Sequence, residues 1–280
     1  MGRIDIAATL ASIDLPAEVW EQLDLLGEII RVTDEQFTRL DQRHLITTME
    51  EGLVVAIVHQ QISALKGVYL LLRAELAHQA ASQVRLFCEG LITLRYVTLD
   101  PGERVRRFLE YSHIEAYEAT AALLLWDQAG AQEEHVRRMQ AVLATLAPRY
   151  QQHRSTYQTE GKHGKRRNFH NWSGRSIAQQ ATECGRAYEK LYRSIYAQMS
   201  AYVHGSAWSL RHTASYSMKS YDPGGIILDA KAIVAATLVV WIRFASLADE
   251  LYGSTLQRDA RSIVEEARKL RDDEFTRHHA

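Results

Sequence analysis

The chain has 280 residues, of which 46% are hydrophobic and 24% charged, and its formal net charge at pH 7 is −1. This near-neutral balance excludes a global attraction to nucleic acid or to an anionic membrane, so any such binding must come from a local patch. Two cysteines without a C-x-x-C pair exclude a disulfide framework and a cysteine-based zinc site.

Helical periodicity dominates the first hundred residues, and alternation typical of strands is almost absent. Pro16, shortly after Asp14, predicts a helix start. Residues 52–78 are apolar on a broad face, which predicts a helix that crosses the core. Residues 79–99 follow with little turn signal and predict a further helix.

The clearest break is Asp100-Pro101-Gly102-Glu103, where a capping aspartate, an early proline and an acidic first turn predict a helix start. A helix up to Gly130 and another over residues 132–158 are expected. Residues 159–176 form a polar segment longer than most connections, which makes it a functional candidate. Two helices follow, around 177–184 and 186–204.

The C-terminal part begins with a predicted turn at residues 220–229, with a short extended piece. The apolar run from Ala232 to Ile242 is about half the roughly 20 residues that cross a bilayer. We therefore expect a buried core helix, no membrane association and a cytoplasmic protein. A homodimer interface is a second way to bury this helix.

These elements predict an all-α fold, namely a single compact bundle of roughly eight to ten helices. Residues 1–50 are expected to be an N-terminal helical extension packed on the main helical domain, residues 51–280.

A stripe of side chains four residues apart ends at His204. It contains Tyr188, Tyr192, Tyr196, Ser200 and His204, which share one helix face. His204 is a candidate general acid or base because imidazole titrates near neutral pH, and Ser200 is a candidate to orient it or to bind substrate. The alternative is a helix C-terminal cap, in which His204 donates to free carbonyls and Gly205 takes the left-handed position.

Arg85 and Glu89 lie four residues apart in a largely apolar segment. Arginine before glutamate is the weaker order for a pair within one helix, which favours a tertiary partner for each. Arg85 is a candidate phosphate ligand, and Glu89 is a candidate to orient His204. A structural ion pair between helices is the competing interpretation.

The polar segment interleaves cations with aromatic rings. Such a composition suits single-stranded nucleic acid, because bases stack on aromatic rings while cations bind phosphates. A solvated loop whose Trp172 plugs the bundle is the alternative. The candidate RNA-binding residues are Lys165, Arg166, Arg167, Phe169, His170 and Trp172.

Two other patterns carry little weight. Helical ribonucleases of the HEPN superfamily carry R-x(4–6)-H, but roughly three such spacings are expected by chance in a chain this rich in Arg and His. The spacing occurs at Arg39/His44, Arg73/His78, Arg106 or Arg107/His113, and Arg271/His278. Glu75-x-x-His78 is half of a di-iron motif whose second half is missing, so no metal or cofactor is expected.

Three motifs together resemble a family of bacterial helical proteins catalogued as domain of unknown function 5677. They are R-x-x-x-E at Arg85/Glu89, W-x-G-x-S-I from Trp172, and Y-x-x-x-S-x-x-V-H-G from Tyr196. The resemblance runs from about Leu71 to the mid-200s and brings no established activity. The family looks similar to HEPN-type helical domains, which implies RNA cleavage or a role in phage defence.

Two functions therefore remain open. The first is a HEPN-like, metal-independent ribonuclease or toxin-type RNA-binding protein, with His204, Arg85, Glu89 and Ser200 as its catalytic pocket. The second is a non-enzymatic binding or assembly module, in which the same residues form a structural clasp between helices.

Overall fold

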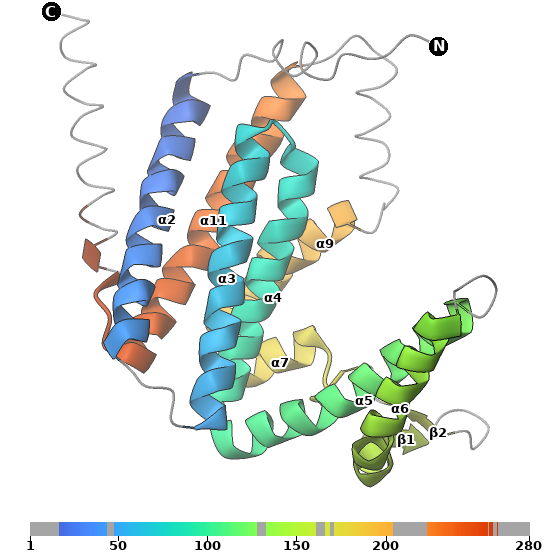
Figure 1. Ribbon diagram of the computed structural model, residues 1–280. Coiled ribbons are helices and arrows are strands. Elements are labelled where there is room, and N and C mark those ends of the chain that lie inside the picture. Colours follow the sequence, from blue (N-terminus) through green and yellow to red (C-terminus); the bar gives the residue numbers. More distant parts are fainter. Residues whose placement is uncertain are drawn as a thin grey trace, which may run out of the picture. The chain divides into compact units, whose positions relative to one another are not determined.

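The computed structural model describes residues 17–43, 48–127, 133–160, 166–168, 171–203 and 223–256, together with 258, 259 and 262. Most of these residues are helical, so the predicted all-α class is confirmed. The helices, drawn in Figure 1, are α2 (Ala17–Arg43), α3 (Met49–Arg73), α4 (Ala77–Leu99), α5 (Pro101–Asp127), α6 (Glu133–Arg154), α7 (Ile177–Glu183), α8 (Arg186–Leu191), α9 (Ala197–Val203) and α11 (Pro223–Tyr252).

The chain separates into two compact units, which are described one at a time. The first unit comprises residues 1–96 and 181–280, and the second unit comprises residues 97–180. The expected division of the chain at residue 50 stays a prediction. Within the first unit, α2 packs against both α3 and α11.

Helices α2, α3, α4 and α11 run alongside one another in the first unit (Figure 1). Helix α3 begins at a capping box, in which the backbone N–H of Glu51 donates to Thr48 Oγ1 and the N–H of Thr48 donates to Glu51 Oε2, both at 3.1 Å. Phe244 of α11 joins the helices, because its ring lies 5.7 Å from the rings of both Phe37 and Phe87. All three rings are buried, so the core of this unit is formed between α2, α4 and α11.

Helix α11 begins at Pro223, inside the segment predicted as a turn. The prediction failed because a proline at the first helical position has the backbone angle that a helix needs and no N–H to leave unpaired. Farther along, Trp241 Nε1 donates to Thr33 Oγ1 at 3.0 Å, and Thr33 Oγ1 donates to the Ile29 carbonyl at 2.7 Å. The buried indole N–H is therefore satisfied, as a core tryptophan requires.

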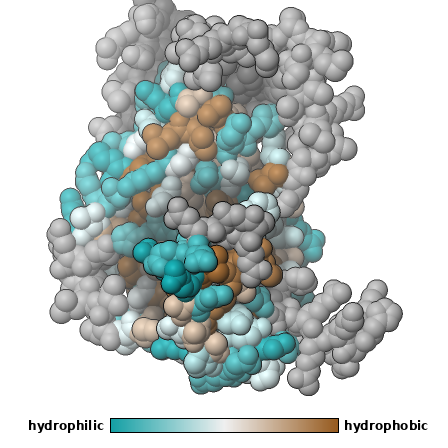
Figure 2. Space-filling view, turned by 45° about the vertical axis from the view of Figure 1, so that its right-hand side comes forward, coloured by the Kyte–Doolittle hydropathy of each residue, from teal (hydrophilic) through white to brown (hydrophobic). Residues whose placement is uncertain are grey.

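Helix α3 and the Ala230–Tyr252 part of α11 are long and apolar enough to cross a membrane by length and composition, a criterion that core helices of soluble proteins also meet. Within the structure, α11 buries Val240 and Phe244 and exposes Val239 and Ile242. Figure 2 shows hydrophobic and hydrophilic patches side by side on one face, so apolar side chains do reach the surface.

The second unit is built on the antiparallel pair α5 and α6, whose Tyr117 and Tyr150 rings stack at 4.1 Å. The predicted polar loop contains a short antiparallel hairpin, β1 (Gln158–Glu160) paired with β2 (Arg166–Asn168). Helix α6 buries none of its residues, and it contains Pro148, which cannot donate to the carbonyl four residues earlier. Tyr157, directly before the hairpin, is fully buried.

Candidate functional site

A π-helical turn interrupts the helix on which the tyrosine stripe was predicted. This turn, η2 (Tyr192–Tyr196), joins α8 to α9, and the Ala197 N–H donates to the Tyr192 carbonyl five residues earlier. Such turns are rare and occur frequently at functional sites. The wider turn keeps Tyr192 and Tyr196 on one side, and their rings stack with centroids 5.0 Å apart.

Tyr196 lies between the two charged residues predicted for the site. Arg85 Nη2 donates to the Tyr196 hydroxyl at 3.2 Å, and that hydroxyl donates to Glu89 Oε2 at 3.2 Å. The Arg85 Nη2 to Glu89 Oε2 distance is 3.8 Å, and the guanidinium lies 5.3 Å from the centre of the Tyr196 ring. These three residues, called the clasp below, connect α4 to η2.

The clasp lies at the edge of the core. The side chains of Arg85 and Glu89 are 22% and 34% exposed, whereas Tyr196 is buried. Burial raises the pKa of Tyr196, and the hydrogen bond from Arg85 partly opposes this shift. The Tyr196 hydroxyl therefore stays protonated at neutral pH and can donate to Glu89. With its three groups paired to one another, the clasp is well suited to hold two helices together.

The other half of the predicted pocket lies toward the end of α9. Ser200 is partly buried on this helix. Tyr202 packs edge-on against His78, with ring centroids 5.3 Å apart, so the end of α9 lies beside the start of α4. His204 lies outside the described residues. Its predicted interaction with Glu89 stays a prediction, and the partner that the structure gives Glu89 is Tyr196.

The predicted RNA-binding residues are spread over the hairpin and the segment after it. Arg166 and Arg167 belong to β2, whereas Lys165, Phe169 and His170 lie outside the described residues. Trp172 is 9% exposed, and its ring packs edge-on against Phe108 of α5 at 5.5 Å. This packing matches the alternative in which Trp172 plugs the helices; its predicted contact with RNA stays a prediction.

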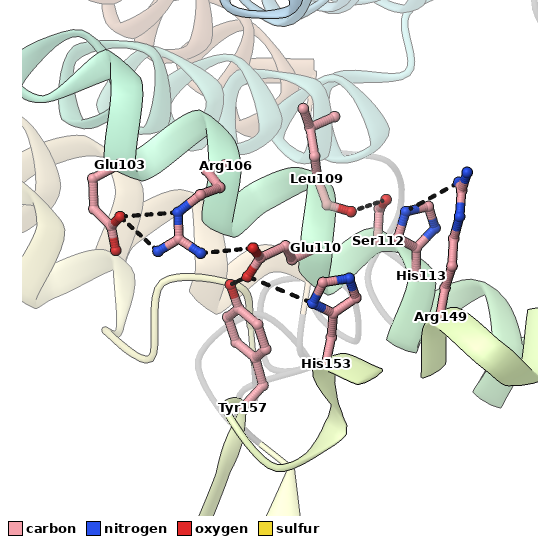
Figure 3. A network of polar contacts seen from close by, with 9 residues as sticks. All are labelled: Glu103, Arg106, Leu109, Glu110, Ser112, His113, Arg149, His153 and Tyr157. Atoms are coloured by element: carbon pink, nitrogen blue, oxygen red, sulfur yellow. Dashed lines mark hydrogen bonds and ion pairs between the residues drawn. The ribbon is translucent and has the colours of Figure 1, made fainter. Parts of the chain in front are cut away.

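A second polar cluster lies between α5 and α6, and we did not predict it from the sequence (Figure 3). Its centre is Glu110, which accepts a 2.6 Å hydrogen bond from Arg106 Nη1 and a 2.8 Å hydrogen bond from the Tyr157 hydroxyl. His153 Nδ1 lies 3.8 Å from Glu110 Oε2. We call Arg106, Glu110, His113, Arg149, His153 and Tyr157 the histidine network.

Two imidazoles meet in this network. The rings of His113 on α5 and His153 on α6 are nearly parallel, at 22°, with centroids 6.0 Å apart. Arg149 Nη1 lies 3.4 Å from His113 Nε2. Burial lowers the pKa of His113, and the charges of Arg149 and His153 lower it further. His113 is therefore neutral at pH 7, with a lone pair that can accept a proton.

One sequence signal did point to this cluster. Arg106 and His113 have one of the R-x(4–6)-H spacings, which we had attributed to chance. In the structure Arg106 binds Glu103 and Glu110, while the arginine beside His113 is Arg149 from the neighbouring helix. The spacing within α5 could not reveal Arg149, because Arg149 lies on α6 and is brought close to His113 only by the packing of the two helices.

Within the described parts of the chain, no three His, Cys, Asp or Glu side chains are placed to hold a metal ion. The side chains of the histidine network can transfer protons and bind anionic groups.

The all-α fold, with motif residues on α4 and α9, agrees with the class of helical protein that the sequence predicts. The chain belongs to DUF5677, a family of unknown function, whose model matches residues 51–219. The matched range starts earlier and ends earlier than we expected, and it contains the clasp, the Tyr196–Gly205 motif and the whole second unit. No match was found among curated proteins or among solved structures.

Proposed function

We propose that this protein binds single-stranded RNA through residues 149–175 of the second unit and cleaves it without a metal ion. The observation that carries the proposal is the charge of this segment. It contains seven Lys or Arg residues and one acidic residue, a net charge of +6 in a chain whose net charge is −1. The segment overlaps the histidine network, since Arg149, His153 and Tyr157 belong to both.

The arrangement of the segment supports this proposal. Arg154 lies over the Tyr150 ring at 5.6 Å, and the hairpin brings Arg166 and Arg167 opposite residues that follow α6. In general, cationic side chains bind backbone phosphates, and aromatic rings stack bases without sequence preference. We place the protein in the cytoplasm, where cleavage of cellular RNA would arrest growth, as in toxin or phage-defence systems.

Fluorescence anisotropy with a labelled, fully 2′-O-methylated RNA of about 12 nucleotides measures binding without cleavage. We expect the double variant R166Q/R167Q to bind more weakly and to have a shallower salt dependence, by about 1.4 in the log–log slope if two phosphate contacts are lost. The matched control is R137Q/R138Q, which removes two exposed arginines from α6 that already pair with Glu133 and Glu134.

The proposal is wrong if the wild-type chain shows no binding at low salt, or if the control pair weakens binding as much as the hairpin pair does.

The clasp supports a second function, a non-enzymatic binding or assembly module. Here Arg85, Glu89 and Tyr196 stabilise the packing of α4 on η2, and the predicted Ser200 and His204 extend the same polar contact. A double-mutant cycle between Glu89→Ala and His204→Ala tests this version, because residues in one network couple by about 0.5 kcal/mol or more. Additive losses of stability at the two positions would contradict it.

A further inference from the structure

We propose that His113 and His153 are the acid–base pair of a phosphodiester cleavage site in the second unit, with Arg149 as the phosphate ligand. This inference rests on the proposed function, because it takes RNA as the substrate. It assigns the chemical step to the network between α5 and α6 rather than to the predicted pocket around His204.

The two imidazoles are held from different helices and face each other. His113 belongs to α5, and His153 lies one helical turn after Arg149 on α6. The His153 side chain is 16% exposed and Arg149 is exposed, so a phosphate can approach the edge of the pair. Imidazoles about 6 Å apart can contact different oxygens of one phosphodiester group.

The surroundings of the two rings differ in charge, which separates their roles. His153 faces the Glu110 carboxylate, which Arg106 and Tyr157 hold in place by hydrogen bonds. Because a carboxylate lies beside His153 and a guanidinium lies beside His113, we assign the role of proton donor to His153. His113 faces the Arg149 guanidinium, and its unprotonated Nε2 is the atom that can accept from Arg149 Nη1. His113 is therefore the base.

The reaction balances with these residues alone. The 2′-oxygen of the ribose attacks phosphorus, and its proton passes to His113 Nε2. The bond between phosphorus and the 5′-oxygen breaks, and His153 gives its proton to that oxygen. The products are a 2′,3′-cyclic phosphate and a 5′-hydroxyl, with no oxidant, reductant or hydrolytic water needed in this step. Arg149 leaves His113 Nε2 to bind the phosphate, which frees the base as substrate arrives.

The test uses the full chain with EDTA and an end-labelled, unmodified single-stranded RNA. We expect products that end in a 2′,3′-cyclic phosphate, and an otherwise identical RNA with 2′-O-methyl groups should not be cleaved. We expect His113→Gln and His153→Gln each to lower kcat/KM by about 100-fold or more, while the Kd for the methylated RNA changes less than about threefold. His135→Gln, an exposed position on α6, is the matched control and should cleave at the wild-type rate.

The pH profile of the wild-type chain tests the pair without any substitution. We expect kcat/KM to fall at low pH as His113 takes up a proton. Because burial, Arg149 and His153 lower the pKa of His113, the acidic limb should lie below the usual imidazole pKa of 6.5.

Three outcomes would overturn the inference: full cleavage by both histidine variants, cleavage that requires a divalent cation, or products without a cyclic phosphate. Loss of cleavage in His204→Gln, with both variants of the pair active, would move the catalytic centre to the predicted pocket and leave the proposed function intact. Failure of the wild-type chain to bind the methylated RNA would instead contradict the proposed function itself.

Discussion

Each unit contains a tyrosine hydroxyl that pairs with a glutamate beside an arginine. In the clasp of the first unit, Tyr196 accepts from Arg85 and donates to Glu89, and all three groups bind one another. In the histidine network of the second unit, Glu110 accepts from both Tyr157 and Arg106, and it also faces His153. Carboxylate, phenol and guanidinium rarely exchange protons near neutral pH, whereas imidazole does.

The comparison distinguishes a cluster that stabilises the packing of helices from a cluster that can also transfer protons. The clasp has the groups needed to fix one helix on another, and substitutions in it should change stability. The network adds two imidazoles to the same set, so substitutions in it should change chemistry as well. The following predictions test this division, beginning with the largest expected effect on stability.

Gly90, next to Glu89 on the clasp helix, should not tolerate alanine. A Cβ at Gly90 would lie 1.8 Å from Gln61 Nε2, and Gln61 is 1% exposed, so its amide has no open space to enter. We expect Gly90→Ala to destabilise the protein by about 1–3 kcal/mol and to lower Tm in a thermal melt. Gly102→Ala is the control, because nothing lies within 4 Å of a Cβ there. Equal Tm values for the two variants would refute this packing.

Glu110→Gln should cost about 1–2 kcal/mol, because the charge that strengthens two hydrogen bonds is lost. Burial raises the pKa of Glu110, but the hydrogen bonds from Tyr157 and Arg106 outweigh it and the net pKa is lowered. The stabilisation is therefore present above the ordinary carboxyl pKa of 4.5 and is lost as the pH falls through the lowered value. Urea titrations at pH 7 and pH 3 measure it.

The matched control for Glu110→Gln is Glu133→Gln, since the Glu133 side chain is 95% exposed. We expect the control to change the free energy of unfolding by less than about 0.5 kcal/mol at either pH. A loss that is equal at pH 7 and pH 3 for Glu110→Gln would show that its charge is not what stabilises the network.

Tyr196→Phe should cost about 1 kcal/mol by removing the hydroxyl that connects Arg85 and Glu89. Tyr192→Phe is the control, because its ring stacks on Tyr196 but its hydroxyl makes no hydrogen bond with the described residues. Neither variant should alter the rate of RNA cleavage per folded molecule. A cleavage defect in Tyr196→Phe alone would show that the clasp takes part in the reaction, and would contradict the division of roles between the two clusters.

The ionisation of Tyr157 should give the smallest effect, because it changes stability only at high pH. Burial raises its pKa to about 12, and the hydrogen bond to Glu110 adds to the shift. The neutral phenol is favoured in the folded state, so this stabilisation is complete below pH 10 and is lost as the pH rises toward 12. Tyr157→Phe should therefore flatten the fall of Tm between pH 10 and 12. An unchanged slope would contradict the buried hydrogen bond.

Tyr188 provides the same measurement in the first unit, since burial also raises its pKa to about 12. Tyr188→Phe should flatten the slope by a similar amount, without any change in the histidine network.

Much of the fold could be predicted because helices leave a periodic signal in the sequence. The break at Asp100–Glu103 correctly indicated the start of α5, and the pair Arg85/Glu89 was correctly placed on a helix with a tertiary partner. That partner, Tyr196, was visible in the stripe, but its place opposite both charges was not, because sequence spacing gives no contact between helices. The π-helical turn that carries Tyr196 has no comparable pattern in the sequence.

The histidine network was missed for a similar reason. Its members lie on α5, on α6 and directly before β1, and no short motif connects His113 to His153 forty residues later. The hairpin within the polar segment was also missed, since β1 and β2 are three residues each and show no alternation. Short elements like these depend on the surface they pack against rather than on local propensity.

Helix α6 has a consequence for hydrogen exchange. It has no buried residue, and Pro148, directly before Arg149, cannot donate to the carbonyl of Ala144. Local opening needs little energy where a helix buries few side chains and lacks a backbone bond. We expect the backbone amides of the last turns of α6 to exchange with D₂O far faster than those of α4, and this opening would change the distance between His153 and His113. Binding of an RNA phosphate to Arg149 would slow that exchange.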